Sequence, residues 1–392
     1  MRNPVILLRV GAYLGLAGVA GCVEPYAPAV LDAPSSYLVV DGFINGNGAT
    51  RIKLSRAIGV ATTTAPPPEK GATLYLVDDT GLRYAMRESS AGLYQSDSLL
   101  LSASRQYRLQ IATAGASAAS YASDLVPLKV TPAIDKLDWI GQGDNLTVRL
   151  STHDAQQQAR YYRWNFSETW EFNSAFESKL EYRGGIIQDR LTPIYTCWRT
   201  EQNTLLKQGS SAQLAQDVIT DYQLFSASGH GERFKIRYSV LVSQYAETAQ
   251  EFAYYELLRK NTEAVGGVND PLPSQLTGNV HRLDNPAEPV LGFVGAHTVQ
   301  QRRLFISRQD LNLPSSWLFD SPYASCQLVQ ELVPNPDDKP PIFLPYTRLF
   351  ASPDNVPVDY LFDHGFKIGY LGSSRACVDC RTRGASAKPS FW

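Results

Sequence analysis

The chain has 392 residues, of which 44% are hydrophobic, enough to build cores for two or three domains. Charged residues make up only 19% and the formal net charge is −2. No basic field therefore favours nucleic acid, and we expect no nucleic-acid partner.

The beginning of the chain predicts a lipid anchor. Two early arginines precede the apolar segment Val10–Ala20, which has signal-peptide length and is too short for a permanent membrane span. Small residues stand just before Cys22, as in bacterial lipoprotein signals, where cleavage precedes the cysteine and its thiol receives a diacylglycerol. We therefore expect residues 1–21 to be a lipoprotein signal peptide and Cys22 to be lipidated. The alternative is a chance cysteine after a simple signal peptide.

Residues 22–36 are rich in Pro, Ala and Ser and lack periodicity, so we expect a flexible tether. Short strands separated by turns follow, and Arg51–Ser55 alternates polar and apolar residues with period two. About seven strands in roughly a hundred residues are typical of an immunoglobulin-like sandwich, which we place at residues 37–132.

A second β region follows, which we place at residues 133–392 as a larger immunoglobulin-like sandwich with insertions. Residues Phe234–Ser243 form its strongest strand, expected to be central, and Trp170–Gly209 is expected to be a long insertion. One helix is expected at about 248–264, because Thr248–Glu251 reads TAQE, a capping box. Its apolar face should pack on the sheet. The fold class predicted is therefore all-β, with two immunoglobulin-like domains and one amphipathic helix.

The chain after Leu311 is rich in proline and is expected to be loop-like. Besides Cys22, four cysteines remain, an even number that favours two disulfides with three possible connectivities. They are Cys197, Cys326, Cys377 and Cys380. Pairing each terminal cysteine with a distant one would close long loops and staple the C-terminal tail to the second domain. A zinc site and a redox role for Cys377-x-x-Cys380 are the alternatives.

The sequence offers no catalytic signature. It lacks Gly-x-Ser-x-Gly, His-Glu-x-x-His, a phosphate-binding glycine loop and a dinucleotide fingerprint. His230 lies in Ser-Gly-His-Gly, which we interpret as a turn. We expect a non-enzymatic protein without catalytic residues, metal or cofactor.

Several short motifs, standing in a fixed order, carry a family likeness. They are the lipobox with Cys22, LVVDG at Leu38–Gly42, Cys197-Trp198, YSVLVSQY at Tyr238–Tyr245, NDPLPSQLTGNV at Asn269–Val280, VLGF at Val290–Phe293, CVDCR at Cys377–Arg381 and the terminal KPSFW. In this set the chain resembles the domain-of-unknown-function 4249 family, lipoproteins of the Bacteroidota. It departs from the family where Gly384-Ala385-Ser386-Ala387 replaces a glycine- and asparagine-rich stretch.

The resemblance implies an outer-membrane lipoprotein, often encoded near TonB-dependent receptors, and it transfers no catalytic residue. We therefore expect a protein anchored in the outer membrane by its lipid, on the periplasmic or the cell-surface face, with the surface preferred. Its expected role is that of an accessory or binding component of a TonB-dependent receptor. The alternative is a surface adhesion or scaffold lipoprotein.

Overall fold

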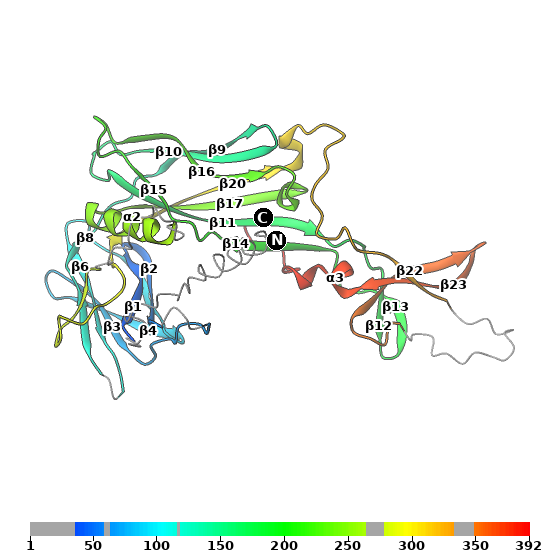
Figure 1. Ribbon diagram of the computed structural model, residues 1–392, viewed down its shortest axis with the longest axis horizontal. Coiled ribbons are helices and arrows are strands. Elements are labelled where there is room, and N and C mark those ends of the chain that lie inside the picture. Colours follow the sequence, from blue (N-terminus) through cyan, green and yellow to red (C-terminus); the bar gives the residue numbers. More distant parts are fainter. Residues whose placement is uncertain (1–35, 59–62, 116–117, 264–277, 333–348) are drawn as a thin grey trace, which may run out of the picture.

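The computed structural model describes residues 36–58, 63–115, 118–263, 278–332 and 349–392. The signal peptide, Cys22 and all of the tether except Ser36 lie outside these residues. The described chain is mostly β-strand, which confirms the all-β class. Figure 1 shows three parts: a first β unit, a second β unit beside it, and a C-terminal arm that projects to one side.

The first unit is a ten-stranded sheet around a single hydrophobic core. The strands run in the order β18-β7-β6-β3-β4-β5-β2-β1-β19, with β8 beside β6. Ile52 and Leu54 enter the core while the intervening Lys53 is exposed, as the alternating sequence predicts. The early strands are β1 (Leu38–Asn45), β2 (Asn47–Arg56), β3 (Thr73–Asp78), β4 (Arg83–Ser90), β5 (Leu93–Leu100), β6 (Gln106–Ala112), β7 (Ser120–Ser123) and β8 (Val126–Pro127).

Two strands of the first unit come from much later in the chain, which corrects the expected assignment of all of residues 133–392 to the second domain. β18 (Val280–Arg282) pairs with β7, and β19 (Ala296–His297) runs parallel to β1. Gly292, with φ +126°, allows this return, because a β-carbon there would collide with the backbone of Val40. Pairing between segments about 160 residues apart (β7 with β18) and about 250 residues apart (β1 with β19) leaves no local pattern in the sequence.

The second unit consists of two sheets facing one core. One sheet has the order β16-β10-β9; the other has the order β14-β11-β17-β20, with β15 beside β11. The strand expected to be central is β17, and it does lie inside its sheet, between β11 and β20. The strands are β9 (Ile134–Gln142), β10 (Asn145–His153), β11 (Tyr161–Asn173), β14 (Thr196–Gln202), β15 (Lys207–Ser210), β16 (Val218–Ser228), β17 (Arg237–Ala246) and β20 (Val299–Ser307), with short helices η2 (Glu232–Phe234) and η3 (Arg308–Leu311).

A polar chain runs through the second core. Trp164 on β11 is fully buried, and its indole Nε1 donates to Oε1 of Gln244 at 2.8 Å. The Gln244 amide in turn donates to the carbonyl of Pro132 at 2.8 Å and to Oγ1 of Thr152 at 2.9 Å. Buried polar groups need such partners. These hydrogen bonds link Pro132, in the connection between the two units, to the centre of the second core.

Helix α2 (Ala249–Glu263) begins and ends within a residue or so of the expected bounds. Oγ1 of Thr248 accepts from the backbone N–H of Glu251 at 3.1 Å, which is one half of the expected capping box. The side chain of Glu251, however, is buried against other charged groups. Phe252 is only half-buried, tilted against Tyr161 with ring centroids 5.1 Å apart. Besides the apolar side chains expected to pack on the sheet, the buried side of the helix therefore also carries a charged group, Glu251.

This geometry sets the effect expected of Phe252→Ala. A fully buried phenylalanine costs about 3–5 kcal/mol when truncated, so a half-buried ring should cost about 1–2 kcal/mol of the free energy of unfolding. Denaturant unfolding would measure this. A loss above about 3 kcal/mol would show that the ring contributes to the core as much as a fully buried residue does.

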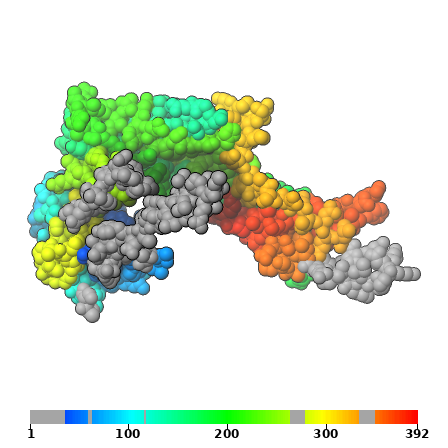
Figure 2. Space-filling model, in the orientation of Figure 1, coloured from blue at the N-terminus to red at the C-terminus, as the bar shows by residue number. Residues whose placement is uncertain are grey.

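The C-terminal part corrects the expectation of a loop-like tail. It contains the sheet β21-β23-β22 and the hairpin β12-β13 beside it, with a small core of their own. His364 and Gly365 join β22 to β23 with positive φ at both positions, 46° and 85°, as a two-residue hairpin turn requires. The elements are β12 (Leu180–Arg183), β13 (Ile186–Asp189), β21 (Val329–Leu332), β22 (Asn355–Asp363), β23 (Phe366–Ser374), α3 (Arg375–Val378) and η4 (Cys380–Thr382). Figure 2 shows this arm extending away from the body.

Candidate functional site

Two disulfides lie at the base of the arm: one joins it to the body, and the other lies within the arm's own small core. Cys197 on β14 pairs with Cys380, and Cys326 pairs with Cys377, with Cα–Cα distances of 5.7 and 5.8 Å. Each bridge links a distant cysteine to one of the terminal pair, as expected for staples of the C-terminal tail. A zinc site would need these sulfurs as free thiolates, and a redox Cys-x-x-Cys motif would need Cys377 and Cys380 to pair with each other. In the structure each of them is bridged to a distant cysteine instead.

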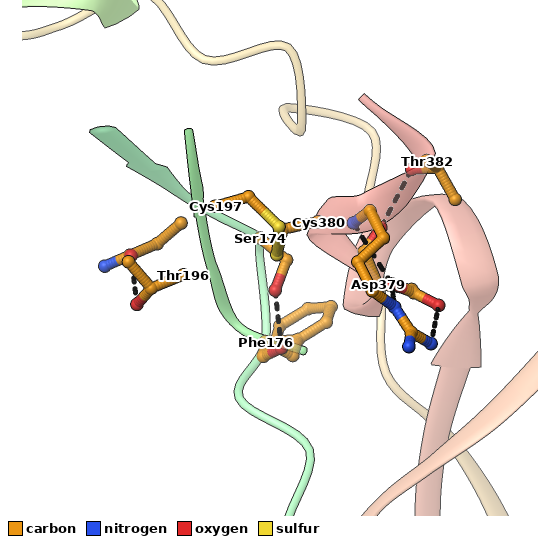
Figure 3. The surroundings of a disulfide bond; sticks show 9 residues. Ser174, Phe176, Thr196, Cys197, Asp379, Cys380 and Thr382 are labelled. Carbon is orange, nitrogen blue, oxygen red and sulfur yellow. Dashed lines mark hydrogen bonds and ion pairs between the residues drawn. A yellow bond between two sulfur atoms is a disulfide. The ribbon is translucent and has the colours of Figure 1, made fainter. Parts of the chain in front are cut away.

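Asp379 organises the turn between the two terminal cysteines (Figure 3). Its carboxylate accepts from the backbone N–H of Arg381 at 3.1 Å and from Nε and Nη2 of that guanidinium, both at 2.8 Å. Burial raises the pKa of Asp379, but the bonds from Arg381 outweigh it and the net pKa is lowered. Asp379 therefore stays ionised and holds the cysteine turn in shape.

A hollow of about 420 Å³ lies where the body meets the arm. Its wall combines aromatic rings with charged groups, namely Phe172, Phe176, Tyr195, Tyr323, Glu232, Lys235, Arg308 and Asp320. Arg383 fixes one side: it donates to both carboxylate oxygens of Glu232, at 2.9 and 2.6 Å, and lies over the ring of Phe172. Such a surface suits a polar ligand with one flat apolar face, because rings stack and side chains hydrogen-bond.

A buried charged cluster lies between the two β units. Arg163 on β11 bonds Oε1 of Glu247, and its Nη2 lies 3.6 Å from Oε1 of Glu251. His297 on β19 of the first unit lies with Nε2 3.4 Å from the same Glu251 oxygen. These side chains are 0–8% exposed. Gly295 leaves room for the Glu251 carboxylate, which a β-carbon at that position would meet. The cluster thus joins α2, the second sheet and the first unit.

Burial controls the charges of this cluster. Burial raises the pKa of Glu247 to about 7, because it outweighs the attraction of Arg163, and the charge of Glu251 adds to the rise. Burial also lowers the pKa of His297, in spite of the nearby Glu251. Phe43 stacks on the His297 ring at 4.3 Å, which covers it from the first unit. The cluster therefore favours a neutral His297 and an incompletely ionised Glu247.

The last residues of the chain dock on the second unit. Nε1 of Trp392 donates to Oε2 of Glu171 on β11 at 3.1 Å, and the ring packs edge-on against Phe305. The guanidinium of Arg303 lies over Phe391, which nevertheless remains 40% exposed. Trp392 is thus docked on the second unit of its own chain, whereas Phe391 is only partly covered.

The histidine singled out in the sequence lies in a turn, as predicted. His230 follows β16, its Nδ1 lies 2.6 Å from the carbonyl of Leu318, and its ring stacks on Trp317 at 4.0 Å. Within the described ranges, no group of three or more His, Cys, Asp or Glu side chains could hold a metal ion. Among the same residues, no helix has the length and apolar character needed to cross a membrane.

The family follows from a match over the two β units. The model of a domain of unknown function, DUF4249, matches residues 23–303, more than two thirds of the chain. The chain belongs to the DUF4249 family. The match confirms the family resemblance and ends within β20, so most of the arm lies beyond the matched DUF4249 region. No curated protein matches the chain.

Solved structures give only remote likenesses to this DUF4249 protein. A DUF4785 family protein from Legionella pneumophila is 10% identical, with a TM-score of 0.18, over 52% of this chain and 51% of that one. The adhesin InvE of Yersinia pseudotuberculosis is 11% identical, with a TM-score of 0.17, over 77% of this chain and 68% of that one. A putative carbohydrate binding protein from Bacteroides uniformis is 9% identical, with a TM-score of 0.12, over 55% of this chain and 92% of that one. The chain spans about half the length of the first.

Sequence reasoning missed the buried charged cluster. Arg163 stands in a strand-forming run and Glu247 directly follows one. A charge at either place usually faces solvent, and only tertiary contacts bury these two side chains. One signal was available: His297 follows the apolar run Val290–Ala296, which indicates burial at that point. The aromatic hollow draws on segments far apart in the chain and leaves no local signal.

Proposed function

We propose that this protein is a non-enzymatic lipoprotein, anchored in the outer membrane through Cys22, that serves as an accessory binding component of a TonB-dependent receptor. Family membership and the lipobox support the anchor. The arm supports the binding role and is the observation that carries the proposal, because it extends away from a rigid, doubly stapled base. The cell-surface face is the preferred location.

The arm ends in exposed apolar residues. Phe362 and Phe366 flank the hairpin turn and are 58% and 76% exposed, and Leu332 at the end of β21 is 62% exposed. Single exposed apolar residues are ordinary, but two phenylalanines at the tip of a projecting hairpin form a compact apolar surface. Buried aromatic anchors dominate the energetics of protein interfaces. The tip therefore suits docking to a partner protein.

The two β units support a further proposal about the body. We infer that they are immunoglobulin-like modules. The paired antiparallel sheets of the second unit, with one core between them, support this for that unit. Such modules serve as rigid spacers, which would hold the arm at a fixed place relative to the anchor.

The anchor is tested by Cys22→Ala. Lipidation requires the thiol, so the variant should leave the outer membrane and appear as a soluble or unprocessed form after fractionation. Retention of the variant in the outer membrane at the level of the unmodified protein would contradict the lipoprotein assignment.

The receptor partnership is tested by purifying the lipidated protein from native membranes and identifying the proteins that come with it. We expect a TonB-dependent receptor to co-purify, and the double variant Phe362→Ser/Phe366→Ser to lose it. Leu100→Ser is the matched control, because Leu100 is 89% exposed but lies on β5 of the first unit. Assembly on the cell surface without any receptor would favour the adhesion or scaffold alternative.

A further inference from the structure

Three arginines meet in a second hollow, at the base of the arm. The hollow has a volume of about 340 Å³ and lies beside the β12–β13 hairpin and the cysteine turn. Arg190, Arg375 and Arg381 line it, together with the acidic Glu181 and Asp379. Three guanidiniums against two carboxylates leave the hollow with one net positive charge.

Arg190 is held rigidly by the arm. Its Nε donates to Oγ of Ser178 at 2.8 Å and its Nη2 to the carbonyl of Leu180 at 2.8 Å. Its side chain is 11% exposed. Nη1, the remaining nitrogen, lies 3.9 Å from Oε2 of Glu181, too far for a hydrogen bond.

The other two arginines are held by the cysteine turn. Arg375 donates through Nε to the carbonyl of Pro353 at 2.7 Å and through Nη1 to Asp379 at 3.3 Å. Arg381 uses Nε and Nη2 on Asp379. Within the described residues, Nη2 of Arg375 and Nη1 of Arg381 make no hydrogen bond to the protein. Each of the three guanidiniums therefore keeps one donor nitrogen for a ligand.

Both disulfides preorganise this arrangement. Arg375 lies two residues before Cys377, and Arg381 directly follows Cys380, so each bridge fixes the backbone next to an arginine. The backbone N–H of Cys380 also donates at 2.9 Å to the carbonyl of Ile194, another residue of the wall. A site fixed before binding loses little conformational entropy when it binds.

The three arginines are close enough for the charges of Arg375 and Arg381 to disfavour the charged form of Arg190. Burial lowers the pKa of Arg190, and the charges of Arg381 and Arg375 lower it further, against the opposing effect of Glu181 and Asp379. Like charges held together in a partly buried site are relieved by a bound anion. Guanidinium forks match the oxygen geometry of phosphate groups, and several can share one tetrahedral anion.

We propose that this hollow binds a phosphate group, carried either by a small phosphorylated solute or by a lipid headgroup. The proposal rests on the binding role proposed above and names a ligand class for it. It concerns a site on the arm base, separate from the apolar tip that we assign to the receptor.

Binding is tested on the full chain in its soluble form, released by Cys22→Ala, because the lipid anchor would itself insert into vesicles. Titration calorimetry with inorganic phosphate examines the free anion, and flotation with phosphatidylcholine vesicles, with and without phosphatidic acid, examines the headgroup. We expect Arg375→Gln to weaken binding by about tenfold or more, since it removes one charged donor. Raising the salt concentration should also weaken binding.

Arg87→Gln is the matched control. It makes the same charge change at a side chain that is 85% exposed on β4, and it should leave the affinity within about twofold, because distant surface charges are screened. If Arg375→Gln does not fold, Arg381→Lys replaces it: this variant keeps the charge but loses the fork.

The two probes and the two variants distinguish a free solute, a lipid headgroup and the absence of a phosphate site. Phosphate binding that Arg375→Gln weakens and Arg87→Gln leaves intact supports a free phosphorylated solute. The same pattern seen only with phosphatidic acid vesicles supports a lipid headgroup. Absence of binding to both probes, or equal loss in the two variants, overturns the proposal. A receptor that still co-purifies in that case would leave the proposed function standing, so the two failures are distinguishable.

Discussion

Replacing Cys197 and Cys380 together by alanine should destabilise the protein by about 2–5 kcal/mol and free the base of the arm. The bridge joins residues 183 positions apart, so its removal returns a large loop-closure entropy to the unfolded chain. It also releases the segment that lies against β14, where Trp198 and Ala385 exchange backbone hydrogen bonds at 2.9 Å. Denaturant unfolding measures the stability, and limited proteolysis after Thr382 measures the release of the tail.

The control for this prediction is the second bridge. Cys326→Ala/Cys377→Ala opens a loop of only 51 positions, so it should cost less stability, and it should loosen the arm rather than its attachment to the body. Equal stability of the Cys197/Cys380 variant and the unmodified protein would show that the arm is held by its non-covalent contacts alone.

The sequence predicts those parts of this fold that depend on residues close together in the chain. The alternation in β2, the capping threonine of α2 and the apolar run of β17 depend on neighbouring residues, and each element forms at or near the place that the pattern predicts. β17 begins at Arg237 instead of Phe234, because Phe234 lies in the short helix η2. The hairpin β22–β23 also had a local signal, because His364-Gly365 separates two strand-forming runs. The prolines before it obscured that signal.

Other features depend on contacts that a sequence pattern does not contain. β19 pairs in parallel with β1, about 250 residues earlier in the chain, so no connecting turn in the sequence indicates the pairing. Glu251 fits a helix N-terminus, and only the approach of Arg163 and His297 turns its side chain inward. The proposed phosphate site likewise combines Arg190, which directly follows β13, with Arg375 and Arg381 beside the terminal cysteines. Such sites arise where distant segments meet.

Arg163→Met should cost about 3–5 kcal/mol at pH 8, because it leaves Glu247 and Glu251 buried without their cation. At pH 5 the cost should be smaller, since a carboxyl group in this cluster can take up a proton and lose its charge. Unfolding curves at the two pH values measure the difference. Arg199→Met is the control: Arg199 pairs with Glu201 at 2.6 Å, but its side chain is 38% exposed, and exposed pairs contribute at most about 1 kcal/mol.

The pH dependence of the cluster itself is isolated by Glu247→Gln. The folded protein raises the pKa of Glu247 from its ordinary 4.5 to about 7, so the folded state binds this proton more tightly than the unfolded chain does. Its stabilising contribution is therefore complete below pH 4.5 and is lost as the pH rises to 7. His297, whose pKa is lowered, acts in the opposite sense and is present in both proteins, so it largely cancels in the comparison. Relative to the unmodified protein, Glu247→Gln should gain stability between pH 5 and pH 8. A difference that stays constant over this range would show that Glu247 is already ionised in the fold at pH 5, and that Arg163 outweighs the effect of burial.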